Sequence, residues 1–124
     1  AGVYQADQRL VGRVDAVYIP VDNTVVSALE AAIKVCEQNR LPLFSGDTDS
    51  VARGTVAALA VDYRRMGEQT ADMAARILKD GKKPGDMPVE SIKEPALHVT
   101  TAAAARMGLT LPQTVLERAD KVLR

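Results

Sequence analysis

Hydrophobic and polar positions follow one another along this chain in blocks that predict short strands alternating with helices. Residues 14–20 and 41–45 are short, mostly apolar runs, which are typical of parallel strands buried on both faces. Between them, residues 24–39 carry apolar side chains at helical spacing, which predicts one continuous amphipathic helix. A strand, a helix and a second strand form a βαβ unit, whose crossover is almost always right-handed. The N-terminal part of the chain therefore predicts an α/β fold.

The pattern of the remaining residues adds further helices and short strands. Residues 51–61 fit either a helix or a strand, and we favour a strand over 56–61 because a new helical stripe begins at Tyr63. The other expected elements are helices over 4–13, 101–107 and from 111 to Leu123, short edge segments at 88–90 and 97–100, and a turn-rich loop at 80–86. Together they predict a three-layer, open and mostly parallel sheet with helices on both faces.

Composition and charge narrow the function classes. The chain has 124 residues, of which 47% are hydrophobic and 26% are charged, so one domain or one lobe with a buried core is expected. Lys plus Arg and Asp plus Glu number 16 each, and this balance argues against nucleic acid as a partner and against an anionic membrane surface. No apolar run reaches the roughly 18 residues of a membrane helix. A start at Ala1 without a signal sequence suggests a mature, trimmed or fragmentary product.

Few residues have the arrangement that cofactor or metal chemistry requires. His98 is the single histidine, so a Ser-His-Asp triad is not convincingly completed, and no cluster has the spacing of a zinc site. The single Cys36 lies on the apolar side of the expected helix over 24–39, where it predicts core packing. We therefore predict no cofactor and no metal.

Polar side chains follow each of the first two strands, and they are the strongest functional signal in the chain. Acid, amide and hydroxyl groups come directly after each apolar run. Loops at the carboxyl ends of neighbouring parallel strands lie side by side, so these groups are expected to converge on one rim. The residues are Asp22, Asn23 and Thr24 in the first loop, and Asp47, Thr48, Asp49 and Ser50 in the second.

The first loop has two interpretations. Asp22 or Asn23 can simply cap the following helix, as these residue types often do. The free amides and dipole of that helix can also attract a carboxylate, while Asp22 pairs with an ammonium group. A zwitterionic amino acid carries both groups, so the second interpretation predicts such a ligand.

The second loop has three interpretations. It can be a solvated turn in which Asp49 or Ser50 caps a helical turn. It can add ligand contacts or help two lobes close. Asp47-x-Asp49 also fits the short D-x-D-x-[T/V] signature of haloacid-dehalogenase-type phosphotransferases, in which the first Asp is the nucleophile and Mg²⁺ assists. The companion residues of that signature are hard to place in this chain.

Four stretches of the chain, in order, resemble the substrate-binding proteins of bacterial ABC transporters, in the group linked to aromatic or branched amino-acid uptake. The stretches are DAVYIPVDNTVVSAL at 15–29, LPLFSGDT at 41–48, RGTVAALAVDY at 53–63 continued by MGEQT at 66–70, and ARMGLTLP at 105–112. The resemblance departs from the family at 99–101, where the family usually has Asn. It implies a flavodoxin-like lobe of a type I periplasmic binding protein, in which two lobes close on a small ligand.

The resemblance also implies the role of the chain. Residues 1–124 are expected to form the C-terminal portion of such a protein, with a helix in residues 63–83 crossing toward an N-terminal lobe that is absent here. The implied function is binding a small polar ligand, an amino acid, for an ABC importer, with no catalysis. Asp22, Asn23 and Thr24 would hold the polar head of the ligand, while Asp47, Thr48 and Ser50 would add hydrogen bonds.

Further expectations concern partners and location. The implied partner is the transporter permease, and the implied location is periplasmic or extracytoplasmic, with a lipid anchor in a Gram-positive cell. A fragment without the N-terminal lobe leaves the surface that faces that lobe uncovered. Such a fragment is expected to form a homodimer. The alternatives from other classes are the phosphotransferase that uses Asp47 and Asp49, and a ligand-sensing regulatory domain of the same fold.

Overall fold

The computed structural model describes residues 2–124, and their contacts divide the chain into two compact units. The sheet unit comprises residues 2–60 and 96–124. The helical unit is the segment Val61–Pro95, inserted between the two parts of the sheet unit.

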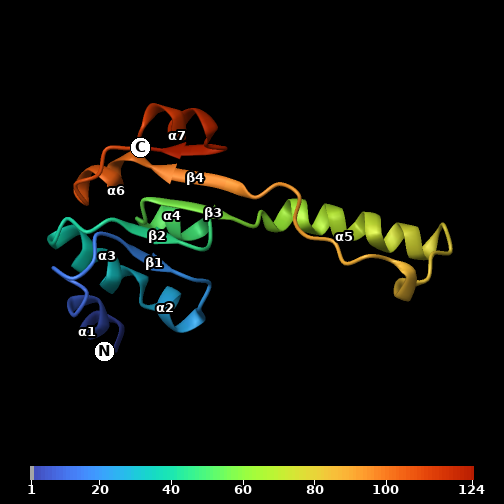
Figure 1. The fold of residues 1–124 in the computed structure, drawn as a ribbon, viewed down its shortest axis with the longest axis horizontal. Coiled ribbons are helices and arrows are strands. Elements are labelled where there is room, and N and C mark those ends of the chain that lie inside the picture. The colour runs from blue at the N-terminus through green and yellow to red at the C-terminus, as the bar shows by residue number, and fades with distance from the viewer. Residues whose placement is uncertain (1) are drawn as a thin grey trace. The chain divides into compact units, whose positions relative to one another are not determined.

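The sheet unit contains a mixed five-stranded sheet whose strands follow one another in chain order (Figure 1). The strands are β1 (Val17–Ile19), β2 (Leu43–Ser45), β3 (Ala57–Ala60), β4 (Ala96–Thr100) and β5 (Lys121–Leu123). β1 pairs with β2, β2 with β3, and β4 with β5 in parallel, whereas β3 and β4 are antiparallel. The predicted open, mostly parallel α/β fold is confirmed.

Helices pack along this sheet and bury its apolar side chains. Figure 1 shows α1 (Gly2–Gln8), α2 (Asn23–Ser27) and α3 (Leu29–Gln38) beside β1 and β2, and α6 (Thr101–Arg106) and α7 (Gln113–Arg118) beside β4 and β5. The short helix α4 (Asp49–Arg53) connects β2 to β3. The larger apolar cluster brings together fully buried Leu29 and Cys36 of α3, Leu43 of β2 and Met107 after α6. Cys36 is thus part of the core, as predicted.

The prediction of one continuous helix over 24–39 is wrong in one respect. The segment forms two helices, α2 and α3, which are separated at Ala28. Ala28 has φ −111° and ψ 21°, outside the helical region, and its N–H bonds to the oxygen of Val25 at 3.0 Å. The apolar residues on both sides of the break keep helical spacing, so periodicity alone could not reveal it. α3 ends at Gln38 with Asn39 as its C-cap, within one residue of the predicted end.

The C-terminal residues also differ from the single helix expected there. α7 ends at Arg118, and Ala119 takes extended dihedral angles (φ −71°, ψ 129°). Asp120 then ties the chain to β4, because its N–H donates to the oxygen of Leu97 at 2.9 Å and its Oδ2 accepts from the N–H of Leu97 at 2.8 Å. Val122 therefore lies in a strand although its spacing also suited a helix.

Three smaller expectations about strands need correction. Residues 97–100 lie in β4, which is an interior strand between β3 and β5 and not an edge segment. β1 is not buried on both faces, because Val17 and Ile19 are buried while Tyr18 is 65% exposed. Residues 88–90 form no strand.

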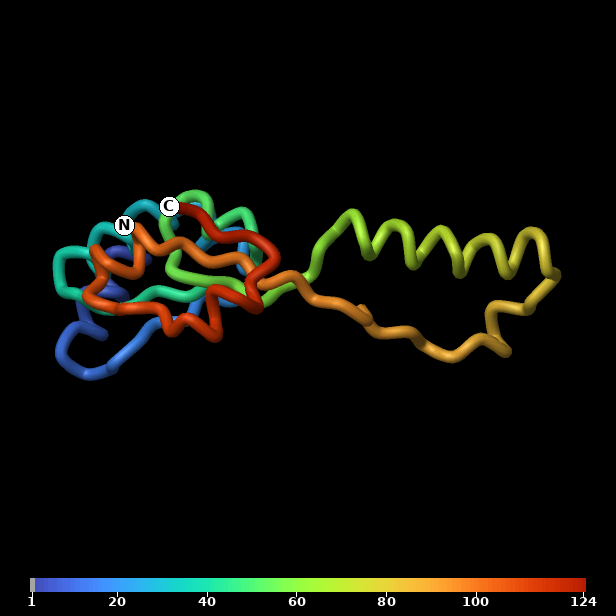
Figure 2. The backbone as a smooth tube through the Cα atoms, turned by 90° about the horizontal axis from the view of Figure 1, so that it is seen from above, coloured from blue at the N-terminus to red at the C-terminus, as the bar shows by residue number. Residues whose placement is uncertain are grey.

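The helical unit consists of α5 (Tyr63–Leu78), the short 3₁₀ turn η1 (Pro84–Asp86) and an extended segment that returns alongside the helix (Figure 2). Asp62 caps α5, since its Oδ1 accepts from the N–H groups of Arg64 and Arg65 at 2.9 and 3.1 Å. Glu90 of the returning segment bonds to the guanidinium of Arg76 and accepts from Gln69 at 3.2 Å. Among residues 2–124, no helix has both the length and the apolar character needed to cross a bilayer.

Candidate functional site

The two polar loops after β1 and β2 touch each other at one end of the sheet. Ile19 pairs with Ser45 in the parallel register, so both strands end at the same level. The N–H of Gly46 donates to the oxygen of Ile19 at 2.8 Å. An added Cβ on Gly46 would lie 3.3 Å from the backbone nitrogen of Val21. The structure therefore brings Asp22 and Asp47 to one rim, as the parallel arrangement predicts.

The first loop places three exposed polar residues, Asp22, Asn23 and Thr24, at the start of α2. Oδ1 of Asp22 accepts from the N–H of Val25 at 2.9 Å, so Asp22 is the helix cap. Because α2 has only five residues, it lacks the aligned peptide dipoles of the long helix expected from the sequence. Recognition of an anion at this loop would depend on its side chains and nearest amides.

The second loop is held by an internal network centred on Asp47. Its Oδ1 accepts from the N–H of Ser50 at 2.8 Å, and its Oδ2 accepts from the Ser50 hydroxyl at 2.7 Å. The hydroxyl of Ser45 donates to the carbonyl oxygen of Asp47 at 3.1 Å and lies 2.8 Å from the Thr55 hydroxyl in the core. Asp47, and not Asp49 or Ser50, is therefore the residue whose side chain caps α4.

This network bears on the phosphotransferase interpretation. Both carboxylate oxygens of Asp47 are engaged by Ser50, which is an arrangement that serves a helix cap and not a free nucleophile. Asp49 is exposed in the first turn of α4. In the part of the chain that the structure describes, no three His, Cys, Asp or Glu side chains are grouped as metal ligands would be.

Arg53 joins the helices that follow the two loops. Its guanidinium, at the end of α4, donates to Oε1 of Glu30 at 2.8 Å and to the carbonyl oxygen of Val26 at 2.9 Å. The hydrogen bond from Arg53 holds the pKa of Glu30 below its ordinary value. This bridge links α2 and α3 to α4, so it fixes the spacing of the helices behind the rim.

Sequence reasoning missed Tyr18 and Val21 as residues of the rim. Each of these two side chains is 65% exposed, and both approach Gly46. A Cβ added to Gly46 would lie 2.9 Å from the Tyr18 hydroxyl and 3.3 Å from Cγ2 of Val21. The available signal was the two-residue alternation of β1, which places Tyr18 on the opposite face from buried Val17 and Ile19.

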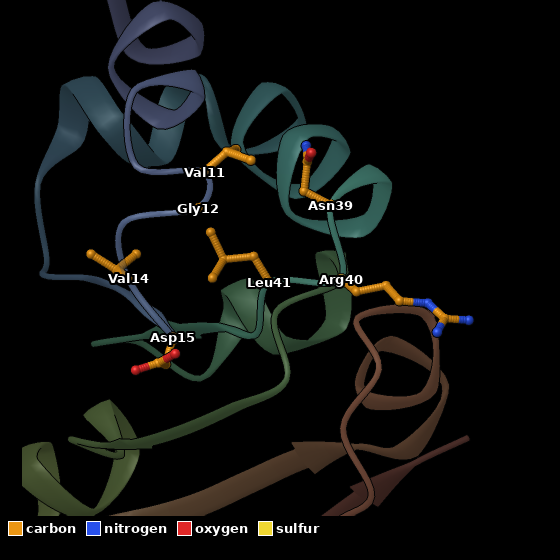
Figure 3. Close-up of a pocket in the computed structure, with 7 residues that line it drawn as sticks. All are labelled: Val11, Gly12, Val14, Asp15, Asn39, Arg40 and Leu41. Atoms are coloured by element: carbon orange, nitrogen blue, oxygen red, sulfur yellow. The ribbon is translucent and has the colours of Figure 1, made fainter.

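A hollow of about 250 Å³ lies at the other end of β1 and β2 (Figure 3). Its polar side chains do not converge, because Figure 3 shows Arg40 and Asp15 directed to different sides. The stem of Arg40 packs beside Gly108, and the amide of Asn39 donates to the oxygen of Val35 at 2.8 Å. These side chains have structural roles, so the rim remains the better candidate. The lining residues are Val11, Gly12, Val14, Asp15, Asn39, Arg40 and Leu41.

Two buried titratable groups lie where α1 meets α3. Asp7 is 9% exposed, and its Oδ2 has no hydrogen-bond partner. Burial raises the pKa of Asp7. Burial, together with the nearby Asp7 charge, raises the pKa of the Cys36 thiol to about 11. The thiol is therefore protonated near neutral pH, as befits a core side chain.

Several solved structures are similar to the chain. A conserved domain protein from Vibrio cholerae O1 biovar El Tor is 40% identical with a TM-score of 0.78, and the match covers 97% of this chain and 40% of that one. An ABC domain in complex with L-Trp from Streptococcus pneumonia is 26% identical with a TM-score of 0.79, covering 98% of this chain and 41% of that one. The ligand-free, open structure of a substrate-binding protein with adhesive properties from Clostridium difficile is 29% identical with a TM-score of 0.81, covering 98% and 40%.

Sequence comparisons point to the same class of protein. The chain is 36% identical over 92 residues to a tyrosine-binding protein of Clostridioides difficile strain R20291, which corresponds to 74% of this chain and 26% of that protein. The chain thus spans about a quarter of the length of this curated relative. The family model described as ABC transporter substrate binding protein matches residues 1–123. The chain belongs to the family of ABC transporter substrate-binding proteins.

Proposed function

We propose that this chain supplies one wall of an amino-acid-binding site in the solute-binding component of an ABC importer. The observation that carries the proposal is the contact between the two polar loops at the ends of β1 and β2. Relatives described as tyrosine-binding or solved in complex with L-Trp support an amino acid, and an aromatic one in particular, as the ligand. The activity is binding and release, without catalysis.

The proposed roles follow from the hydrogen bonds that each side chain already makes. Oδ1 of Asp22 caps α2, which leaves its Oδ2 to accept from a ligand ammonium. Asn23 and Thr24, both exposed, donate to the ligand carboxylate. Thr48 adds a hydrogen bond from the second loop, and Asp47 adds one through the acceptor lone pairs that Ser50 leaves open. Ser50 is buried and donates to Asp47, so it acts by holding Asp47 in place.

The larger assembly is part of the same proposal. Because the solved relatives are about two and a half times as long as the matched region, the ligand would be covered by a second lobe outside this chain. A helix within residues 63–83 would cross toward that lobe. The complete protein would work outside the cytoplasm, in the periplasm or on a lipid anchor, and would deliver its ligand to a permease. The fragment alone would form a homodimer.

Removing the negative charge of the Asp22 side chain tests this proposal. Asp22→Asn in the full-length protein keeps a good capping residue but removes the carboxylate that pairs with the ammonium. We expect the affinity for L-tyrosine or L-tryptophan, measured by isothermal titration calorimetry, to fall by about tenfold or more, which corresponds to about 1.4 kcal/mol. Asp22→Ala should weaken binding at least as much.

The matched control is Asp15→Asn, an exposed acid that precedes β1 at the other end of the strand. It should leave the affinity unchanged within about twofold, and both variants should keep the thermal midpoint of the parent. An unchanged affinity in Asp22→Asn would refute the proposed role of the first loop.

A further inference from the structure

We propose that Tyr18 and Val21 form the part of the site that contacts the ligand's side chain, and that Tyr18 makes it favour a planar aromatic side chain over a branched aliphatic one. This inference rests on the proposed function, since it assigns the specificity of the same site. None of the residues expected from the sequence to bind the ligand is apolar, so the polar loops alone account only for the zwitterionic head.

Tyr18 is exposed at a position in the sheet where a large side chain is normally covered. A large apolar or aromatic side chain on a strand of an α/β sheet is normally covered. Tyr18 is nevertheless 65% exposed, although its neighbours in β1, Val17 and Ile19, are 8% and 4% exposed. Val21, one residue before Asp22, is exposed to the same extent as Tyr18. An exposed aromatic ring beside polar loops is an arrangement that suits ligand stacking.

The side chains of Tyr18 and Val21 converge on Gly46. The Tyr18 hydroxyl and Cγ2 of Val21 lie 2.9 and 3.3 Å from the point where a Gly46 Cβ would stand. Gly46 is the residue directly before Asp47, and its N–H is bonded to Ile19. Tyr18 thus reaches from β1 to the start of the second loop, and the missing Cβ makes room for it. The ring and the head-binding groups are therefore within the reach of one amino acid.

The polar end of the Tyr18 side chain is available to a ligand. Among residues 2–124, no protein group hydrogen-bonds to the hydroxyl of the exposed Tyr18 side chain, so this hydroxyl is open to solvent or to a ligand. A ligand that stacks on the ring can also reach this hydroxyl. The chemistry of the subsite is therefore an aromatic face with one donor and acceptor at its edge.

The competing explanation is that Tyr18 is covered by polypeptide outside this chain and contributes only to packing. The two explanations differ in what a substitution changes. A ligand-contacting tyrosine alters the ratio of affinities for aromatic and aliphatic ligands, because only the aromatic ligand gains from stacking. A packing tyrosine alters the thermal midpoint and leaves that ratio unchanged.

The experiment compares L-phenylalanine and L-leucine by calorimetry in the full-length protein. We expect the parent to bind L-phenylalanine at least tenfold more tightly than L-leucine. Tyr18→Leu should weaken L-phenylalanine binding by about tenfold and change L-leucine binding by less than about twofold. Tyr18→Phe, which keeps the ring, should retain most of the preference. Tyr4→Leu is the control, because Tyr4 is an exposed tyrosine in α1 whose hydroxyl contacts Gln8.

Three results would overturn the inference. One is a parent protein that does not prefer L-phenylalanine, and another is a Tyr18→Leu variant with an unchanged affinity ratio, whether or not its thermal midpoint falls. In both cases the proposed function survives if Asp22→Asn still weakens amino-acid binding. The third is a parent protein that binds neither amino acid, and in that case the proposed function fails as well.

Discussion

Different kinds of interaction stabilise the inside of the sheet unit and the inside of the helical unit. The sheet unit buries large apolar side chains completely, with Leu29, Leu43 and Met107 each at 0% exposure. The helical unit has no buried residue in α5, and it leaves Leu78 and Val89 82% and 99% exposed. Its order depends on the Asp62 cap and on the bonds that Glu90 makes to the helix.

This difference predicts how each unit responds to amino-acid substitution. Burial of apolar surface contributes about 25 cal/mol per Å², whereas exposed ion pairs contribute about 1 kcal/mol or less. The sheet unit should therefore be sensitive to the volume of its core side chains. The helical unit should be sensitive to backbone propensity and to the charge of a few carboxylates.

The largest expected effect comes from truncating matched apolar residues in the two units. Leu29→Ala, at a fully buried position in α3, should lower the free energy of unfolding of the sheet unit by about 3 kcal/mol. Met73→Ala, at a half-buried position in α5, should lower the stability of the helical unit by about 1 kcal/mol or less. Hydrogen exchange followed by mass spectrometry separates the two units. Equal losses of protection in the two units would contradict the expected difference in their sensitivity to truncation.

A smaller effect should come from replacing one glycine in each unit by alanine. Gly54 has φ +128°, and a Cβ there would lie 3.3 Å from Cδ1 of Ile33, so Gly54→Ala should cost about 2 kcal/mol. Gly67 lies inside α5 with nothing within 4 Å of an added Cβ. Gly67→Ala should therefore stabilise the helical unit by about 0.5 kcal/mol, because alanine is the better helix former.

Thermal unfolding followed by circular dichroism measures both glycine variants against the parent. Gly81→Ala offers a control for backbone strain without a clash, since Gly81 has φ +69° but open space around it. If Gly54→Ala and Gly67→Ala shift the thermal midpoint in the same direction, the contrast between the two units is not of the proposed kind.

The smallest effect is a pH dependence of opposite sign in the two units. Burial raises the pKa of Asp7, so the folded sheet unit binds a proton more readily than the unfolded chain and gains stability as the pH falls toward the raised pKa. The bond from Arg76 lowers the pKa of Glu90, so the stability that this pair contributes is present above the unfolded pKa of about 4.3 and is lost as the pH falls below it.

Hydrogen exchange between pH 7 and pH 3 should therefore show stronger protection of α1, and weaker protection of the segment around Glu90 once the pH is below about 4.3. Asp7→Asn should remove the first dependence, and Glu90→Gln should remove the second. A parent protein whose two units respond with the same sign would contradict the assignment of these carboxyl groups.

The comparison of the two units also explains what the sequence could predict. Apolar periodicity correctly indicates β1, β2, β3 and α5, because burial imposes that pattern on strands and on amphipathic helices. It fails at Ala28, where the period continues through a break, and at Val122, where tertiary pairing with β4 overrides helical spacing. It also fails to predict that β4 is interior, since strand order depends on pairing between distant segments.

The candidate site shows the same limit. The approach of the two polar loops follows from parallel strands in sequence order, so Asp22 and Asp47 are found from the pattern alone. The network of Ser45, Asp47 and Ser50 is not, because capping geometry decides which of several polar residues takes the role. The exposure of Tyr18 depends on what covers one face of β1, which no local pattern reports.

The burial of Cys36 makes the chain convenient for site-specific labelling. Maleimide reagents attack an accessible thiolate, and Cys36 offers neither access nor ionisation near neutral pH. A cysteine introduced at exposed Asp49 would then be the reactive thiol of this chain. An environment-sensitive fluorophore attached there would test whether an amino acid binds beside the rim, without any need to replace the native cysteine.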